Sequence, residues 1–232
     1  MIRLHLVVEG PSELGFAREV LKPYLAVRGV GVSPRCVETS RDRRTRKIFR
    51  GGMLVYKHLK KDLTLWMKQD RSTDAFFSTM IDLFRVPDDF PGYVDAKRCA
   101  DPYERVAQME KALARDLSSR RFVPYIQLHE FEALLLCDPT AFERSFPARG
   151  DAVRDLARIA SAFDSPELID DGDDTAPSKR IIHHIPEYEY QKGSAGPLVA
   201  KRIGADLMRA KCRHFNEWVT KLETLGQESD AG

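Results

Sequence analysis

Four short apolar runs, each followed by a segment long enough for a helix, constrain the fold of this chain most strongly. The runs cover residues 4–8, 30–37, 75–81 and 123–128, and the helices expected between them cover residues 13–21, 53–68 and 102–117. Strands that alternate with helices are joined by crossover connections, which place the strands parallel in one sheet. The sequence therefore predicts an α/β fold with a mainly parallel four-stranded sheet flanked by helices.

The second half of the chain has a different character. Past residue 128 the apolar pattern predicts only helices, which we place at residues 130–136, 151–163, 198–209 and 212–225. Residues 165–180 are rich in Asp, Gly, Pro and Ser, a composition typical of a long loop. The chain therefore combines an α/β half with a helical half.

The size of the chain suits this division. It has 232 residues, of which 43% are hydrophobic and 31% charged, as is ordinary for a globular protein. That length permits one large domain or a core with an appended lobe. We expect an α/β core at residues 1–140, a C-terminal helical lobe packed on it at residues 141–226, and a flexible tail at residues 227–232.

The sequence lacks the marks of several protein classes. No apolar run approaches the roughly 20 residues of a membrane span, and the N-terminal stretch is too short and too quickly acidic for a signal peptide. Four cysteines stand far apart without a CxxC pair, which favours reduced thiols in the cytoplasm over a zinc site or a disulfide framework. Neither GxxxxGK[ST] nor GxGxxG occurs, so we do not expect nucleotide hydrolysis of the P-loop kind.

The first apolar run ends in a glutamate. In the sequence HLVVEGPSE, Glu9 follows the strand directly and Glu13 opens the next helix, which we expect Pro23 to stop. Glu9 thus lies at the C-terminal end of a parallel strand, where such sheets place their chemistry. A carboxylate buried there needs a divalent cation or a cationic substrate as its partner. The alternative is that Glu9 ends the strand in water and Glu13 only favours a helix N-terminus.

A second carboxylate follows the third apolar run. Asp82 comes directly after residues 75–81, in the same topological place as Glu9. Two carboxylates at the ends of neighbouring parallel strands can share one Mg²⁺, which prefers one or two carboxylates together with water and phosphate oxygens. The alternative is a turn or a helix cap, the usual role of a lone aspartate after a strand.

The fourth run leads into the sequence QLHEFEALLLCDP, which holds His129, Glu130 and Glu132. On a helix, Glu130 and Glu132 would flank the apolar stripe on opposite sides, whereas His129 and Glu132 would share a face. If the strand persists to Phe131, Glu130 and Glu132 share a face instead. The sequence leaves both arrangements open, and a purely structural role at a strand-to-helix junction is a further alternative.

Basic residues gather in two parts of the chain. Residues 41–50 read RDRRTRKIFR and precede a pair of glycines, and a second basic group falls within the sequence APSKRI. Clustered basic residues beside a metal site fit a track for a polyanion, although such a run is also typical of a solvated surface. Gly196, before an expected helix, suggests an anion site at that helix N-terminus. The candidate phosphate-binding residues are Arg43, Arg44, Arg46, Lys47, Lys179 and Arg180.

Five motifs carry a resemblance to a known family. They are VEGPSE, DLFRVPDDFPG, QLHEFEALLLCDP, PELIDDGDDTAPSKRI and CRHFNEWVTKL, and they run in order from near residue 5 to near residue 222. In these motifs the chain resembles the bacterial family called domain of unknown function 4276, whose fold is considered Toprim-like. The resemblance implies a Toprim-like sheet, with distant similarity to the overcoming-lysogenization-defect nucleases.

The resemblance also implies a metal site and partners. In Toprim proteins a glutamate after the first strand and an Asp-x-Asp pair after a later strand hold Mg²⁺ for phosphodiester chemistry. Glu9 matches the glutamate and Asp82 the first aspartate, but Phe84 stands where the second aspartate is expected. Asp88, Asp89, Glu130 or Glu132 could compensate. Relatives of this kind are often encoded beside ABC-type ATPases in mobile-element or phage-defence gene clusters, so such an ATPase is an expected partner.

The leading interpretation is a cytoplasmic, Mg²⁺-dependent or Mn²⁺-dependent nuclease or nuclease subunit of a bacterial defence system. Glu9, Asp82 and Glu132 would bind the metal, and His129, Glu130 and Glu132 would complete the catalytic set. One alternative is a catalytically silent subunit that binds an ATPase or nucleic acid. Another is metal-dependent phosphoryl transfer on a small nucleotide.

Overall fold

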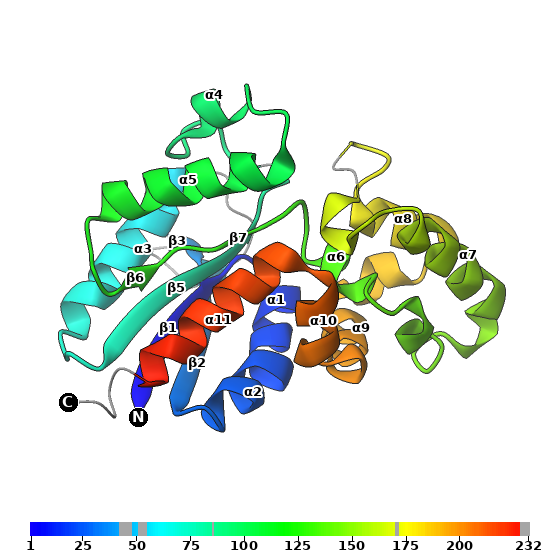
Figure 1. Cartoon of the computed structure of the whole chain (residues 1–232), viewed down its shortest axis with the longest axis horizontal. Helices are drawn as coiled ribbons and strands as arrows, with labels where there is room; N and C mark the ends of the chain where they lie inside the picture. The colour runs from blue at the N-terminus through cyan, green and yellow to red at the C-terminus, as the bar shows by residue number, and fades with distance from the viewer. Residues whose placement is uncertain (42–47, 51–54, 85, 170–171, 228–232) are drawn as a thin grey trace.

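A single parallel sheet forms the centre of the protein. The structure is a computed structural model, and it describes residues 1–41, 48–50, 55–84, 86–169 and 172–227. The strand order is β2-β1-β5-β6, and β7 also pairs with β5 (Figure 1). All these pairs are parallel, so the predicted α/β class and the mainly parallel sheet are confirmed. The strands are β1 (Ile2–Val8), β2 (Val30–Cys36), β5 (Ala75–Asp82), β6 (Phe122–Val123) and β7 (Ile126–Gln127).

The predicted fourth strand is divided into two short pieces, β6 and β7. Pro124 lies between them, and proline has no N–H for the ladder. Thr79 of β5 bridges the gap, because its hydroxyl donates to the Tyr125 carbonyl at 2.9 Å and accepts from the Tyr125 N–H at 3.1 Å. The chain therefore stays beside β5, and β7 reaches Asp82 at the carboxyl end of the sheet.

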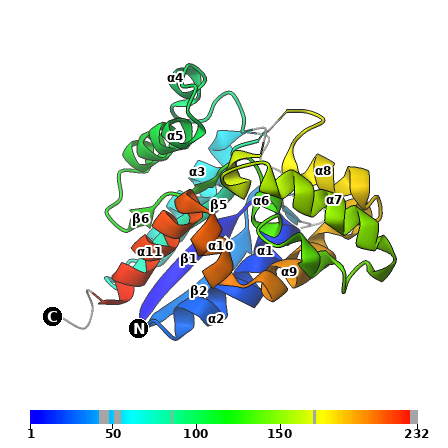
Figure 2. The ribbon, with the colours of Figure 1, turned by 45° about the vertical axis from the view of Figure 1, so that its right-hand side comes forward.

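Helices cover both faces of the sheet (Figures 1 and 2). One apolar cluster joins β5 to the helices α3 (Tyr56–Gln69), α4 (Tyr93–Ala96) and α5 (Pro102–Leu117). The other joins β1 and β2 to the N-terminal helix and to the helices of the second half. Alternate residues of β1 enter the two clusters, as expected of a central strand: Leu6 and Val8 enter one and Val7 the other. A separate antiparallel hairpin consists of β3 (Glu38–Arg41) and β4 (Ile48–Arg50).

The prediction that Pro23 stops the first helix is wrong. The helix runs on through α1 (Pro11–Phe16), a π-helical segment (Ala17–Leu21) and α2 (Lys22–Ala26). At the end of the π segment the Lys22 N–H bonds to the Ala17 carbonyl, five residues back. An interior proline normally clashes with the carbonyl four residues before it. The wider π turn immediately before Pro23 accommodates the ring, so the helix extends to residue 26.

The second half is helical across the residues that the structure describes, as predicted, but its boundaries differ. The helix expected at residues 130–136 is a single turn, and the one expected at residues 198–209 is broken by Gly204, whose φ is +80°. The expected loop at residues 165–180 contains a 3₁₀ turn and the start of a helix. The helices are α6 (Glu132–Leu135), α7 (Gly150–Ser161), α8 (Pro177–His184), α9 (Tyr188–Ile203), α10 (Ala205–Lys211) and α11 (Arg213–Gln227).

The last helix, α11, packs back on the sheet (Figure 1). The Trp218 indole N–H donates to the Ser78 hydroxyl of β5 at 3.0 Å, and its ring stacks on Tyr125 at 4.0 Å between centroids. One apolar cluster therefore runs from β1 to α11 across residue 140. The division into a core at residues 1–140 and a lobe at residues 141–226 remains a prediction.

Glycine and proline face each other twice where α1 meets α9. A Cβ atom on Gly15 would lie 2.3 Å from Pro197 Cγ, and one on Gly193 would lie 3.2 Å from Pro11 Cβ. The two helices can therefore approach only because each glycine faces a proline ring. Gly196 is buried in the same helix, where its Cβ would meet the Tyr188 hydroxyl at 3.0 Å. The anion site expected at Gly196 is thus wrong, because this glycine lies within α9.

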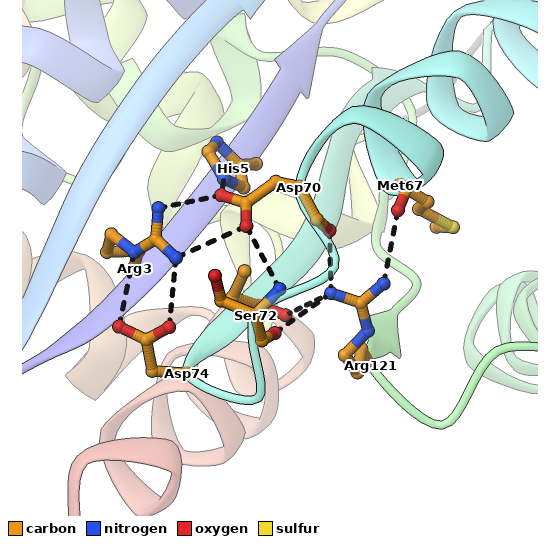
Figure 3. A network of polar contacts seen from close by, with 8 residues as sticks. Arg3, His5, Met67, Asp70, Ser72, Asp74 and Arg121 are labelled. Carbon is orange, nitrogen blue, oxygen red and sulfur yellow. Dashed lines mark hydrogen bonds and ion pairs between the residues drawn. The ribbon is translucent and has the colours of Figure 1, made fainter.

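A polar network ties together the amino end of the sheet (Figure 3). Arg3 of β1 pairs with Asp70 at 2.8 Å and with Asp74 at 2.9 Å, and His5 lies 2.8 Å from the same Asp70 carboxylate. The Arg121 guanidinium donates to the carbonyls of Met67, Asp70, Ser72 and Ala75. These bonds fix the turn between α3 and β5 at the end of the sheet opposite Glu9.

The outer side of β7 is bonded to side chains. The Ile126 N–H donates to Glu110 Oε1 at 2.9 Å, and His214 Nε2 lies 3.1 Å from the Ile126 carbonyl and 3.0 Å from Glu110 Oε1. Burial lowers the pKa of His214, but the hydrogen bond and the charge of Glu110 outweigh burial, so the pKa is raised. Glu167 accepts the backbone N–H groups of His214 and Phe215, both at 2.9 Å, and so caps α11.

None of the helices in the described part of the chain is long and apolar enough to cross a membrane.

Candidate active site

Glu9 and Asp82 lie together at the carboxyl end of the sheet. The parallel register of β1 and β5 pairs Val8 with Met80, so Glu9, directly after β1, and Asp82, the last residue of β5, lie at the ends of neighbouring central strands. Glu9 Oε2 accepts the Asp82 N–H at 3.2 Å, and the Glu9 N–H donates to the Met80 carbonyl at 3.1 Å. Two strands therefore bring these side chains to one place, as their positions in the sequence indicated.

Glu13 joins this pair from the first turn of α1. It is buried, and its Oε2 accepts the Gly10 N–H at 2.8 Å, the bond that the third-position glutamate makes in a capping box. The charges of Glu9 and Glu132 both act on Glu13. The role first considered for Glu13, favouring the start of a helix, is real, but the residue also belongs to the carboxylate cluster.

Glu130 and Glu132 are both buried beside Asp82. The junction forms neither a full helix nor a continued strand: Phe131 caps the single turn α6, and its N–H donates to Asp82 Oδ1 at 2.9 Å. Glu130 accepts from Ser178 of α8, from the N–H at 2.8 Å and from the hydroxyl at 3.0 Å. At this junction the charges of Glu130 and Glu132 both act on Asp82. Neither a regular helix nor a continued strand, the two arrangements considered from the sequence, describes it.

Helix α9 supplies a cation and a hydroxyl to the same place. The Tyr188 hydroxyl donates to Glu132 Oε1 at 3.3 Å, and Lys192 Nζ lies 3.6 Å from the same oxygen. The Lys192 side chain remains about a third exposed, at 34%. Lys192 therefore links the buried glutamate to the protein surface. We use the name carboxylate cluster for Glu9, Glu13, Asp82, Glu130 and Glu132.

Burial and mutual repulsion shift the pKa values of this cluster upward. Burial, followed by the charges of Glu13, Glu9, Glu132 and Glu130, raises the pKa of Asp82 well above its usual range. Burial also raises the pKa of Glu132, although Lys192 opposes it. Burial, with Glu132 and Glu9 adding to it, raises the pKa of Glu13 to about 8. Carboxyls with raised pKa values in one place are typical of functional sites.

The free energy of unfolding should therefore decrease as the pH rises from the ordinary pKa of Glu13, 4.5, to its raised pKa of about 8. Glu13 keeps its proton in the folded state up to about pH 8, whereas the unfolded chain loses it near the ordinary value of 4.5. Between these values the folded state binds more protons, so the free energy of unfolding should fall by up to about 1.4 kcal/mol per pH unit from this group. Urea unfolding at pH 5, 6, 7 and 8 should show a shallower decline for Glu13→Gln.

The control for this measurement is Glu19→Gln. Glu19 lies on the same helical stretch but is exposed, and its pKa is lowered by Lys201. The Glu19→Gln chain should keep the wild-type decline. If Glu13→Gln declines as steeply as wild type, Glu13 does not hold a proton in the fold.

Several residues near the cluster are engaged elsewhere. Asp89 Oδ1 accepts the Tyr56 N–H at 2.9 Å and so caps α3, and Asp88 lies 4.0 Å from Lys97. The expectation that Asp88 or Asp89 replaces the aspartate missing at Phe84 remains a prediction. His129 is buried at the junction with a φ of +61°, and its carbonyl accepts the Phe84 N–H at 2.8 Å.

The structure tests only part of the predicted phosphate-binding set. Arg43, Arg44, Arg46 and Lys47 lie outside the described residues. Lys179 is exposed on α8 and directly follows Ser178, the serine that holds Glu130. Arg180 donates to the Thr175 carbonyl at 2.6 Å and its guanidinium lies 5.8 Å from the Phe163 ring centroid.

The donors of the carboxylate cluster suit a hard divalent cation. All are carboxylate oxygens, the ligands that Mg²⁺ prefers, and a cation would offset the repulsion that raises the pKa of Asp82. Asp82 Oδ2 takes no hydrogen bond from the described residues, whereas Oδ1 is bonded to Phe131. Within the described ranges, no three acidic, histidine or cysteine side chains are already arranged to hold a metal ion. A cation would therefore have to draw these side chains inward.

The sequence did not identify Glu13, Ser178 or Tyr188 as site residues. Ser178 and Tyr188 reach Glu130 and Glu132 from α8 and α9, more than 45 residues further along the chain. No periodicity or spacing predicts such contacts. The only available signal was the sequence APSKRI, which contains Ser178 and stood out among the motifs.

Comparisons with known proteins agree with the resemblance in the motifs. The family model described as "Domain of unknown function (DUF4276)" matches residues 8–223, nearly the whole chain. No protein with a curated description matches the sequence.

Two similar solved structures are the C-terminal regions of OLD proteins. That of Xanthomonas campestris pv. campestris has a TM-score of 0.47 and 17% identity, and the match covers 99% of this chain and 97% of that chain. That of Burkholderia pseudomallei has a TM-score of 0.45 and 15% identity, with 96% and 99% covered.

Proposed function

The chain belongs to the family called domain of unknown function 4276, and from this premise we propose that it is a Toprim-like, Mg²⁺-dependent nuclease or nuclease subunit. The observation that carries the proposal is the meeting of Glu9 and Asp82, where Glu9 Oε2 lies 3.2 Å from the Asp82 nitrogen, beside three further buried glutamates. Carboxylates gathered at the carboxyl edge of a parallel sheet, with cationic side chains at their rim, suit metal-assisted cleavage of a phosphodiester.

The residues take distinct roles in this proposal. Glu9, Asp82 and Glu13 or Glu132 would hold Mg²⁺, or Mn²⁺ in its place. When bound, the metal would act as a Lewis acid on a phosphodiester oxygen and lower the pKa of a bound water. Glu132 has a raised pKa and contacts Tyr188 and Lys192, so it suits the uptake of a proton from the attacking water. Lys192 and Lys179 would hold phosphate oxygens at the rim.

Phe84 limits the activity that we expect of the isolated chain. It stands where the Toprim pattern has its second aspartate, and Asp89, one of the residues that could compensate, caps α3. A site with one carboxylate fewer should bind a second Mg²⁺ weakly and stabilise the leaving oxygen less. We propose that an ABC-type ATPase, in a phage-defence or mobile-element setting, positions the nucleic acid on this site.

Cleavage of plasmid and of single-stranded DNA and RNA tests the proposal. The purified chain is incubated with Mg²⁺, Mn²⁺ or EDTA, with and without an ABC-type ATPase as the proposed partner. We expect slow metal-dependent nicking that the ATPase accelerates and that Glu9→Gln eliminates.

The matched control is Glu19→Gln, a surface glutamate paired with Lys201, which should cleave like wild type. Two results would contradict the proposal. Cleavage that persists in Glu9→Gln would exclude this site as its source. The absence of cleavage in every combination would instead support a silent subunit that binds an ATPase or nucleic acid.

A further inference from the structure

An open cavity of about 610 Å³ lies on the helical lobe, at the C-terminal end of α9. Its wall is formed by Thr140 and Ala141 of a 3₁₀ turn (Pro139–Phe142), by the start of α7, and by Arg202. Arg144 and Glu143 face the same space. None of these residues belongs to the carboxylate cluster, so this cavity is a separate feature of the molecule.

Neutral acceptors hold one of the two arginines in position. Arg202 Nη1 donates to the Ala141 carbonyl at 3.0 Å and to the Ser145 hydroxyl at 2.8 Å. Such acceptors orient a guanidinium without neutralising its charge, and they leave its other N–H groups available for a ligand. Burial, and then the positive charge of Arg144, lower the pKa of Arg202. The two guanidiniums are therefore close enough to repel each other.

No carboxylate compensates this repulsion. Among the described residues, neither Arg144 nor Arg202 forms an ion pair, even with Glu143 in the same cavity. Other arginines of the lobe are paired within it: Arg149 with Glu187, Arg154 with Asp151 and Arg158 with Asp155. Two unpaired guanidiniums facing one cavity are suited to an anion with several acceptor oxygens, and phosphate fits that description.

The distance along α9 relates this cavity to the carboxylate cluster. Lys192, which contacts Glu132, lies near the start of the helix and Arg202 near its end. The ten residues between them advance about 15 Å at 1.5 Å per residue. One strand of a duplex carries a phosphate about every 3.4 Å of the duplex axis, so a duplex lying along α9 would place about four phosphates over this length.

We propose that Arg144 and Arg202 bind the phosphodiester backbone of a nucleic acid whose scissile bond lies at the carboxylate cluster, about four phosphates away. This inference rests on the proposed function and adds to it a second phosphate-binding surface and its distance from the carboxylate cluster. The arginines contact phosphates and no bases, so they contribute equally for every sequence.

Binding measured without cleavage tests this inference. Fluorescence anisotropy with labelled 20-mers of two unrelated sequences is recorded between 50 and 200 mM salt, with Ca²⁺ in place of Mg²⁺. The double variant Arg144→Gln/Arg202→Gln should bind both sequences roughly tenfold more weakly, and the slope of log K against log salt should shrink by about two. Arg144→Gln alone, which removes a side chain without partners in the described chain, should lower the slope by about one.

Controls separate this inference from the proposed function. Arg154→Gln, an exposed arginine paired with Asp151, should keep the wild-type slope. Glu9→Gln should lose cleavage but keep the contribution of the two arginines to the slope. An unchanged slope in Arg144→Gln and in the double variant would overturn the inference, whatever the cleavage assay gives.

Discussion

Replacement of Asp82 by asparagine should stabilise the metal-free protein and abolish its activity. Asparagine keeps the oxygen that accepts the Phe131 N–H but carries no charge, so the repulsion from the four neighbouring glutamates disappears. Since a carboxyl with a raised pKa destabilises the fold once it ionises, the gain in melting temperature in EDTA should be larger at pH 8 than at pH 5. The loss of a metal ligand should lower cleavage by about a thousandfold, because a metal contributes several kcal/mol to such reactions.

Thermal unfolding with and without 10 mM Mg²⁺ checks both effects. Wild type should gain stability from Mg²⁺ through ligand binding, and Asp82→Asn should gain none. Asp151→Asn, which removes an exposed carboxylate paired with Arg154, should behave like wild type in both buffers. A loss of stability of Asp82→Asn in EDTA would show that Asp82 stabilises the fold, and a remaining response to Mg²⁺ would show that Asp82 is not a metal ligand.

Replacement of Gly15 by alanine should destabilise the chain by about 1–3 kcal/mol, the range for overpacking a well-packed contact. The new methyl group would lie 2.3 Å from Pro197 Cγ and 2.8 Å from its Cβ, and a proline ring cannot rotate away. The helices α1 and α9 would have to separate. Because α1 carries Glu13 and α9 carries Lys192, activity should fall together with stability.

Two variants test the origin of this loss. Gly150→Ala also adds a methyl group at a helical glycine, but its nearest neighbour would be Arg154 Nη1 at 3.7 Å, so stability should be unchanged or slightly higher. Pro197→Ala in the Gly15→Ala background should recover part of the lost stability, as measured by urea unfolding. If the effects of the two substitutions on the free energy of unfolding are additive, this contact does not set the distance between α1 and α9.

Local sequence patterns predicted the sheet and the place of two carboxylates. Glu9 and Asp82 each follow an apolar run, and the ends of parallel strands meet at one edge, so their proximity followed from strand order alone. Pro23 shows where a local rule failed, because a π turn, which the sequence pattern did not reveal, removes the clash. The junction at Glu130 and Glu132 could not be settled, since one helical turn has too few residues for a period.

The rest of the site depends on contacts between distant segments. Tyr188 and Lys192 reach Glu132 only because α9 packs on α1, and that packing depends on glycines facing prolines. In the sequence, the expected helix began only at residue 198, so Gly193 and Pro197 fell before its start. The raised pKa of Glu13 results from its burial, and burial depends on the whole fold and not on the local sequence.

The bonds on the outer side of β7 restrict how this protein can assemble with others. A free sheet edge offers its N–H and C=O groups to a strand of another chain, which leads to β-augmentation, domain swapping or fibrils. Here Glu110 already accepts the Ile126 N–H and His214 lies against the Ile126 carbonyl. A foreign strand would have to displace a buried charged pair to bind at this point, so a partner must recognise this side of the molecule through its side chains.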